Sequence, residues 1–123
     1  MGNILLVDDS VLARYLLKQI LISKGHQIVG EAGDGLECID KVKELSPEMV
    51  ILDLIMPKMK GIETLKEIMK INPEIKVVMC TGDHQEFTVR DAVKYGASGY
   101  IIKPFQKEIV LEEVQHILAE THS

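Results

Sequence analysis

The sequence has little of several features that mark secreted, membrane-bound or nucleic-acid-binding proteins. It contains two cysteines, Cys38 and Cys80, and no secretory signal precedes them, so we expect two reduced core thiols in a cytoplasmic protein rather than a disulfide. No apolar run reaches the roughly 20 residues that span a bilayer, because Asp8 and Asp53 interrupt the longest candidates. With 19 acidic against 14 basic residues, a net charge of −5 argues against a nucleic-acid-binding surface. We therefore expect neither membrane insertion nor nucleic-acid binding.

The sequence does have a regular alternation of short apolar runs with stretches of helical period. A chain of 123 residues with 46% apolar residues has the size and composition of one domain, and no repeat or linker divides residues 1–123. Such alternation is typical of a parallel sheet with crossover helices, so the predicted fold class is α/β. The five predicted strands are Ile4 to Val7, Gln27 to Ala32, Met49 to Leu52, Ile75 to Cys80 and Gly99 to Ile102.

Capping and turn residues place five predicted helices between and after these strands. The first has Ser10 as N-cap and Gly25 as the residue past its C-terminus. The second is opened by Gly33-Asp34-Gly35 and closed by Ser46-Pro47, and the third runs from Gly61 to a stop before Pro73. The fourth lies between Glu86 and Tyr95 and ends at Gly96, and the fifth covers about Gln106 to Ala119. Its predicted apolar face consists of Ile109, Val110, Val114, Ile117 and Leu118.

Residues suited to metal binding and catalysis directly follow four of the five predicted strands. Asp8 and Asp9 come after the first strand, Asp53 after the third, Thr81 after the fourth and Lys103 after the fifth. Because ligands of open α/β sheets bind outside the carboxyl ends of the strands, these side chains can converge. Three converging carboxylates stay ionised only if a cation neutralises them. An all-oxygen set without His or Cys suits Mg²⁺, which commonly combines one or two carboxylates with waters and a phosphate oxygen.

The same side chains together predict phosphoryl transfer. A carboxylate can act as nucleophile, while a metal ion, the ammonium of Lys103 and the hydroxyl of Thr81 stabilise the charge of the transferred group. Taken singly, each residue also has an ordinary structural interpretation, as a helix cap, a turn residue or a solvated lysine. Their occurrence at successive strand ends favours the chemical interpretation.

Four segments carry a family resemblance. They are Leu6-Val7-Asp8-Asp9-Ser10, the stretch ILDLIMPKMKG at 51–61, Cys80-Thr81-Gly82, and the stretch GASGYIIKPF at 96–105. With these segments the sequence resembles, over essentially its whole length, the receiver domains of two-component response regulators. The resemblance implies a flavodoxin-like, doubly wound (βα)5 fold with five parallel strands in the order 2-1-3-4-5.

The resemblance also implies roles for individual residues. Asp53 would be the phosphoacceptor, and Mg²⁺, with Mn²⁺ able to take its place, would be held by Asp8, Asp9, Asp53 and the main-chain carbonyl of Ile55. Lys103 would pair with the incoming phosphoryl group.

Further roles implied by the resemblance concern the backbone and the switch. Three main-chain amides would donate to phosphoryl oxygens, those of Leu54, Ile55 and Gly82. Thr81 and Tyr100 would shift together on phosphorylation. The peptide bond between Lys103 and Pro104 would be cis, which costs only about 0.5–1 kcal/mol before proline.

The function implied is that of a phosphoacceptor switch that assists its own phosphorylation and dephosphorylation, rather than an enzyme in the usual sense. Because the chain ends soon after the fifth predicted helix, we expect one receiver domain with no output domain, monomeric when unphosphorylated. A sensor histidine kinase would donate the phosphoryl group. The ending Lys103-Pro104-Phe105-Gln106 resembles chemotaxis receivers, whose output partner is a flagellar motor switch protein. Candidate contact residues on the output face are Lys94, Tyr95, Tyr100, Lys107 and Glu113.

Two other functions stay open from the sequence. The chain could be a phosphorelay intermediate that passes phosphate from Asp53 to a histidine phosphotransfer protein. It could also be a Mg²⁺-dependent phosphatase with Asp53 as nucleophile, although such enzymes commonly have a second acid where this chain has Ile55. Binding of flavin is disfavoured, because two carboxylates after the first strand would repel a cofactor phosphate.

Overall fold

A computed structural model describes residues 2–82 and 86–120 of the chain. Within these residues five parallel strands form one sheet in the order β2-β1-β3-β4-β5, which confirms the predicted topology. The central strands are almost wholly buried runs of Val, Ile and Leu, as expected for a parallel sheet that is covered on both faces. The strands are β1 (Asn3–Val7), β2 (Gln27–Ala32), β3 (Met49–Asp53), β4 (Lys76–Thr81) and β5 (Gly99–Ile102).

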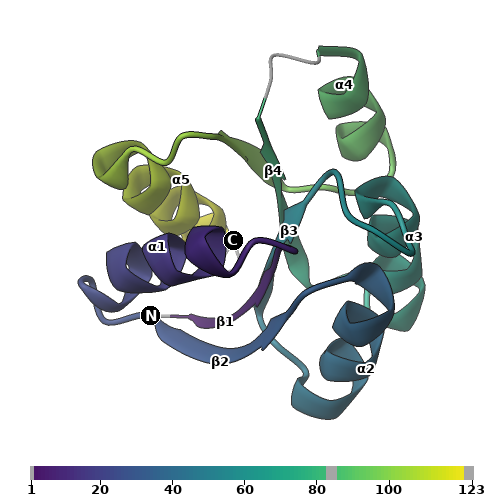
Figure 1. Ribbon diagram of the computed structural model, residues 1–123, viewed down its shortest axis with the longest axis horizontal. Coiled ribbons are helices and arrows are strands. Elements are labelled where there is room, and N and C mark those ends of the chain that lie inside the picture. The colour runs from purple at the N-terminus through teal and green to yellow at the C-terminus, as the bar shows by residue number, and fades with distance from the viewer. Residues whose placement is uncertain (1, 83–85, 121–123) are drawn as a thin grey trace.

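Five helices of the described chain cover the two faces of the sheet (Figure 1). Helices α1 and α5 lie on one face, where the core includes Ile4 and Leu6 of β1, while α2, α3 and α4 lie on the other face, where the core includes Leu5 and Val7. This alternation follows from the two-residue period of a strand. The helices are α1 (Val11–Ile22), α2 (Gly35–Leu45), α3 (Gly61–Ile71), α4 (Glu86–Lys94) and α5 (Lys107–Ala119). None of these helices is long and apolar enough to cross a membrane.

Most predicted boundaries agree with the structure, and two strand ends do not. Asp53 and Thr81 were expected just after their strands, but each is the last residue of one. The ladder continues through them, because Asp53 is paired with Cys80 of β4 and Thr81 with Ile102 of β5. At the end of α1 the helix stops at Ile22, three residues before Gly25, which has a φ of 83°.

The prediction for the apolar face of α5 was partly wrong. Val110, Val114 and Ile117 are buried as predicted, but Ile109 is exposed and Leu111 is buried in its place. On a helix with 100° between residues, Leu111 and Ile109 lie on opposite sides of Val110, and the sheet is on the side of Leu111. The two cysteines are free and buried in the core, as expected, and burial raises the pKa of Cys38 to about 12.

Helix α1 is unusual because it has apolar residues on more than one face. Its core contacts come from Ala13, Leu17 and Leu21, which recur every four residues. Four large apolar side chains in the first half of α1 point to solvent, with exposed fractions of 70% for Val11, 65% for Leu12, 57% for Tyr15 and 45% for Leu16. A helix that is apolar beyond its core face indicates a surface that contacts another molecule.

Candidate functional site

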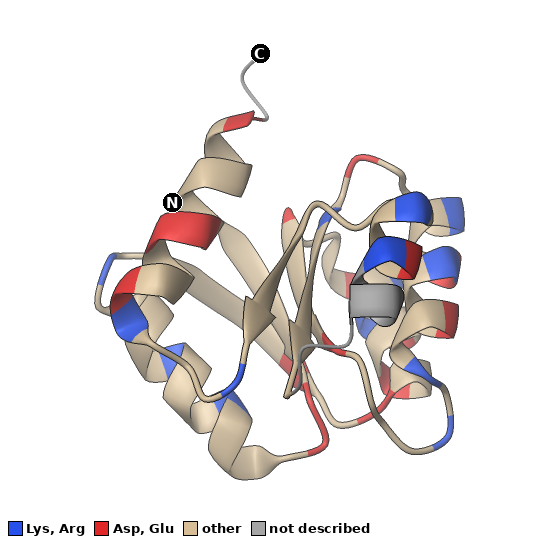
Figure 2. Ribbon diagram, turned by 90° about the horizontal axis from the view of Figure 1, so that it is seen from above, with Lys and Arg blue, Asp and Glu red and all other residues tan. Residues whose placement is uncertain are grey.

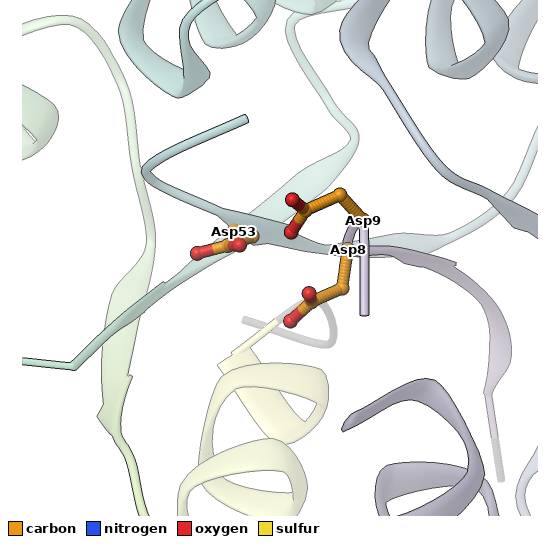
Figure 3. A group of neighbouring side chains, drawn as sticks. All are labelled: Asp8, Asp9 and Asp53. Carbon is orange, nitrogen blue, oxygen red and sulfur yellow. The ribbon is translucent and has the colours of Figure 1, made fainter. Parts of the chain in front are cut away.

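Three carboxylates meet at the carboxyl ends of β1 and β3, where the strand order reverses (Figure 3). Asp8 and Asp9 follow β1, and Asp53 ends β3. One oxygen from each of the three side chains lies within 4.8 Å of the others. Asp8 and Asp53 are buried, whereas Asp9 is exposed. Parallel pairing of β1 with β3 therefore brings together acids that lie 45 residues apart in sequence.

The start of α1 fixes the position of Asp8. The hydroxyl of Ser10 accepts a hydrogen bond from the Ala13 amide at 3.1 Å, which makes Ser10 the N-cap, as predicted. The Ser10 amide in turn donates to Oδ1 of Asp8 at 2.9 Å. One oxygen of Asp8 is thus held by the backbone at the helix start.

Lys103 contacts two of the three carboxylates. Its Nζ lies 2.7 Å from Oδ2 of Asp8 and 3.7 Å from Oδ2 of Asp53. Burial disfavours the charge on Lys103, but the hydrogen bond to Asp8 and the charge of Asp53 outweigh burial and raise the pKa of Lys103. The main-chain amide of Lys103 donates to the carbonyl of Thr81 at 2.8 Å, and the bond from Lys103 to Pro104 is cis. Lys103 is therefore a charged donor held next to the acids.

The surroundings of Asp53 raise the pKa of its carboxyl group. Burial, with the neighbouring charge of Asp8, raises the pKa of Asp53 from 3.8 to about 6, although the ammonium of Lys103 and a hydrogen bond from the Ile55 amide act in the opposite direction. That hydrogen bond, from Ile55 N to Oδ1 of Asp53, is 3.4 Å long. A perturbed carboxylate at the end of a strand, with a cation at hand, is typical of a functional site.

The donor set fits a hard divalent cation. It consists of oxygen ligands, two of them on buried carboxylates, and no His or Cys belongs to this cluster in the described part of the chain. Carboxylate-rich oxygen sites suit Mg²⁺ and Mn²⁺. A bound cation would also relieve the repulsion between Asp8 and Asp53 that contributes to the raised pKa of Asp53.

The other predicted site residues lie around this cluster. Thr81 is buried at the end of β4, next in the sheet to β3, and Gly82 is exposed directly after it. Ile55 is 71% exposed in the loop after β3. The amide of Leu54 donates to the carbonyl of Cys80 at 3.0 Å, so it is engaged in the sheet, which does not support its predicted role as a phosphoryl-binding amide.

Tyr100 lies on the edge strand β5, and its side chain is exposed. It is paired across the ladder with Met79, and its strand neighbour Ile102 is paired with Thr81. The predicted switch residues therefore belong to adjacent strands.

Sequence reasoning missed two residues that hold the loops of the site. Arg14, the fourth residue of α1, donates hydrogen bonds to the main-chain carbonyl of Asp8 and to the carboxylate of Glu31. Lys58, in the loop after β3, has a φ of 69° and an ion pair with Asp34 at 3.4 Å. A cation near a helix N-terminus, where the helix dipole disfavours it, is the sequence signal that could have drawn attention to Arg14.

Comparison with known proteins agrees with this geometry. A family model for the response regulator receiver domain matches residues 4–115. The chain is 42% identical to the chemotaxis protein CheY of Thermotoga maritima over 115 residues, which cover 94% of this chain and 96% of that protein. It is also 42% identical to CheY of Bacillus subtilis over 116 residues, or 94% and 97% of the two chains.

Solved structures show the same fold. CheY of Borrelia burgdorferi, in a complex described as CheX-CheY-BeF3-Mg, has a TM-score of 0.91 and 37% identity, and the match covers 94% of this chain and 88% of that one. NtrX of Brucella abortus has a TM-score of 0.92 and 31% identity, covering 98% of this chain but 27% of the longer NtrX chain. The fold thus occurs both in proteins of this length and as part of longer ones.

Proposed function

Because the chain belongs to the response regulator receiver family, we propose that it is a phosphoryl-accepting switch of a two-component system, with chemotaxis as its pathway. The observation that carries this proposal is the convergence of Asp8, Asp9 and Asp53 at the topological switch point, with Lys103 beside them. Similarity to CheY over 94% of the chain supports the pathway. The proposed place of action is the cytoplasm.

In the proposed reaction the Asp53 carboxylate attacks the phosphorus of a phosphohistidine on a sensor kinase of the CheA type. The new bond joins an Asp53 oxygen to phosphorus, the phosphorus–nitrogen bond breaks, and the imidazole leaves. Mg²⁺ held by Asp8, Asp9, Asp53 and the Ile55 carbonyl would neutralise the negative charge that accumulates on the phosphoryl oxygens. Lys103 would exchange its contact with Asp8 for one with a phosphoryl oxygen, and Thr81 and the amides of Ile55 and Gly82 would donate to the others.

The exposed apolar side of α1 is the surface on which we propose that the phosphohistidine protein docks. It consists of Val11, Leu12, Tyr15 and Leu16 and begins two residues after Asp9, so a protein bound there can present a histidine to Asp53. Figure 2 shows α1 as a mostly tan helix that follows the acidic loop, with blue turns and no red ones. Its charged residues, Arg14 and Lys18, both form ion pairs with Glu31 of β2, so the side of α1 offered to a partner is chiefly apolar.

The output surface that we propose lies on α4, β5 and α5, where Val93, Tyr95, Tyr100 and Ile109 are exposed. Of the contact residues expected there, Lys94, Tyr95, Tyr100 and Lys107 are exposed, while Glu113 is half-buried. A flagellar motor switch protein is the proposed partner in a chemotaxis pathway. A histidine phosphotransfer protein is the alternative, favoured by the apolar side of α1.

Intact-mass spectrometry after incubation with acetyl phosphate and Mg²⁺ tests the proposal. We expect one phosphoryl adduct in the wild type, and none in Asp53→Asn or in the presence of a chelator. An adduct that persists in Asp53→Asn would place the phosphoacceptor elsewhere. Absence of an adduct in the wild type, after a rapid quench and with a histidine kinase as donor, would refute the proposed function.

A second measurement separates the two output alternatives. For the chemotaxis switch, the phosphorylated protein should bind a peptide from a flagellar motor switch protein more tightly than the unphosphorylated protein does. Typical coupling energies of about 1–3 kcal/mol correspond to an increase of several-fold to about a hundredfold. For the relay, radiolabelled phosphate should reappear on a histidine phosphotransfer protein, with no gain in peptide affinity.

A further inference from the structure

The side chain of Arg14 connects α1 to the end of β1 and to β2, at the edge of the sheet where the three carboxylates lie. Its Nη1 donates to the main-chain carbonyl of Asp8 at 2.5 Å, and its Nε donates to Oε1 of Glu31 on β2 at 3.0 Å. The Arg14 side chain is only 17% exposed. Lys18, one turn further along α1, contacts the other oxygen of Glu31 at 3.5 Å but makes no described contact with Asp8.

The hydrogen bond from Arg14 to the Asp8 carbonyl lies where the chain leaves the sheet after β1. The Asp8 amide still donates to the carbonyl of Ala32 in the manner of a strand, at 3.0 Å, whereas the Asp8 carbonyl accepts from Arg14. That carbonyl belongs to the peptide unit between Asp8 and Asp9. Holding it therefore sets the direction in which the chain enters Asp9, and with it the position of the exposed Asp9 carboxylate.

We propose that Arg14 is a positioning residue for the divalent cation: it orients the Asp8–Asp9 peptide unit so that both carboxylates face one ion, while Glu31 fixes the guanidinium. This inference rests on the metal site of the proposed function and adds to it a residue that touches no metal. Arginine suits the role because its planar fork donates in two fixed directions, whereas the ammonium of lysine is a point charge. Residues that orient metal ligands commonly affect affinity by about 10–100-fold.

The sign of the effect distinguishes positioning from a simple influence of charge. Arg14 is a cation close to a cation site, so if it acted only through its charge, its removal would strengthen Mg²⁺ binding. If it positions the acids, its removal weakens binding in spite of the lost repulsion. The two interpretations therefore predict opposite changes in the dissociation constant.

The experiment is isothermal titration of the full chain with Mg²⁺, in the absence of phosphodonor, for the wild type and three variants. We expect Arg14→Met to weaken Mg²⁺ binding by about tenfold, and Arg14→Lys to recover little of this loss although it keeps the charge. Lys18→Met is the matched control, because it removes a cation from the same glutamate without touching Asp8. It should bind Mg²⁺ as the wild type does or slightly more tightly. Binding by Arg14→Met that equals or exceeds wild-type affinity would overturn the inference.

Loss of stability is separated from loss of positioning by a second control. Ile68→Val removes one methylene from the core on the opposite face of the sheet and lowers stability away from the site. It should leave the Mg²⁺ dissociation constant unchanged even if its melting temperature in chelator falls to that of Arg14→Met. Titration of the wild type tests the proposed function separately. If the wild type binds Mg²⁺ and Arg14→Met binds it equally tightly, the inference fails while the proposed metal site stands. A wild type that binds no Mg²⁺ would refute both.

Discussion

Replacing Asp53 with asparagine should stabilise the metal-free protein, although it removes the proposed phosphoacceptor. Asp53 is buried next to Asp8, and its pKa of about 6 instead of 3.8 means that folding disfavours its ionised form. Between pH 4 and pH 6 the folded state holds a proton on Asp53 that the unfolded state has lost. The stability of the wild type therefore falls as pH rises through this window, and the loss is complete above about pH 6.

The size of the effect follows from the same pKa difference. At about 1.4 kcal/mol for each pKa unit, the change from 3.8 to about 6 corresponds to a penalty of about 3 kcal/mol at pH 8. This penalty is a net value, because the pKa of about 6 already includes the attraction between Asp53 and Lys103, whose charged atoms are 3.7 Å apart. Because Lys103 is partly exposed, solvent screens that attraction. We expect a net stabilisation of about 1–3 kcal/mol at pH 8.

The assay is urea unfolding in chelator at pH 8 and at pH 4, for the wild type, Asp53→Asn and the control Asp40→Asn. Asp40 is exposed on α2, so its replacement makes the same chemical change away from the site and should alter stability little. The gain from Asp53→Asn should be present at pH 8 and largely absent at pH 4. An Asp53→Asn variant that is no more stable than the wild type at pH 8, or whose gain is larger at pH 4, would refute the electrostatic interpretation.

Three further predictions concern the metal, the loop and the lysine. Affinity for Mg²⁺, measured by titration calorimetry, should fall as pH is lowered through about 6, because a proton on Asp53 competes with the ion; constant affinity down to pH 5 would contradict this. Gly61→Ala should cost about 1–3 kcal/mol in urea unfolding, because its Cβ would lie 2.7 Å from the Asp53 carbonyl oxygen, whereas Gly82→Ala meets nothing within 4 Å and serves as control. Lys103→Met should destabilise the metal-free protein by about 1–3 kcal/mol, since it leaves buried Asp8 without its ammonium partner, and Mg²⁺ should recover part of this loss in thermal unfolding. If Lys103→Met lost the same stability with and without Mg²⁺, the ion would not replace the ammonium group as the partner of Asp8.

The fold could be predicted because its signals are local. Buried parallel strands appear as short apolar runs, and residues such as Ser10 and Asp34 mark helix starts through hydrogen bonds to amides a few residues away. The main acids could be predicted for a related reason, since the carboxyl ends of parallel strands always lie along one edge. Neither inference required knowledge of which side chains contact one another in the folded protein.

Features that depend on tertiary contacts could not be predicted in the same way. Periodicity alone did not show that Leu111 rather than Ile109 faces the sheet, because both are apolar and the position of the sheet decides. The Arg14–Glu31 contact joins residues 17 apart and exists because β2 is paired beside β1. The Leu54 amide was assigned to phosphate from resemblance, but strand pairing with β4 already engages it.

The geometry also provides a short physical connection from the acids to the proposed output surface. Lys103 is held to β4 by its amide, which donates to the Thr81 carbonyl, while its side chain contacts Asp8. A phosphoryl group on Asp53 that attracted both the Lys103 ammonium and the Thr81 hydroxyl would therefore act on the ends of β4 and β5 together. Tyr100 lies two residues from Ile102, the partner of Thr81, and is exposed on the edge strand. Phosphorylation at one end of these paired strands can therefore alter the position of an exposed tyrosine. Coupling free energies between two sites are typically about 1–3 kcal/mol.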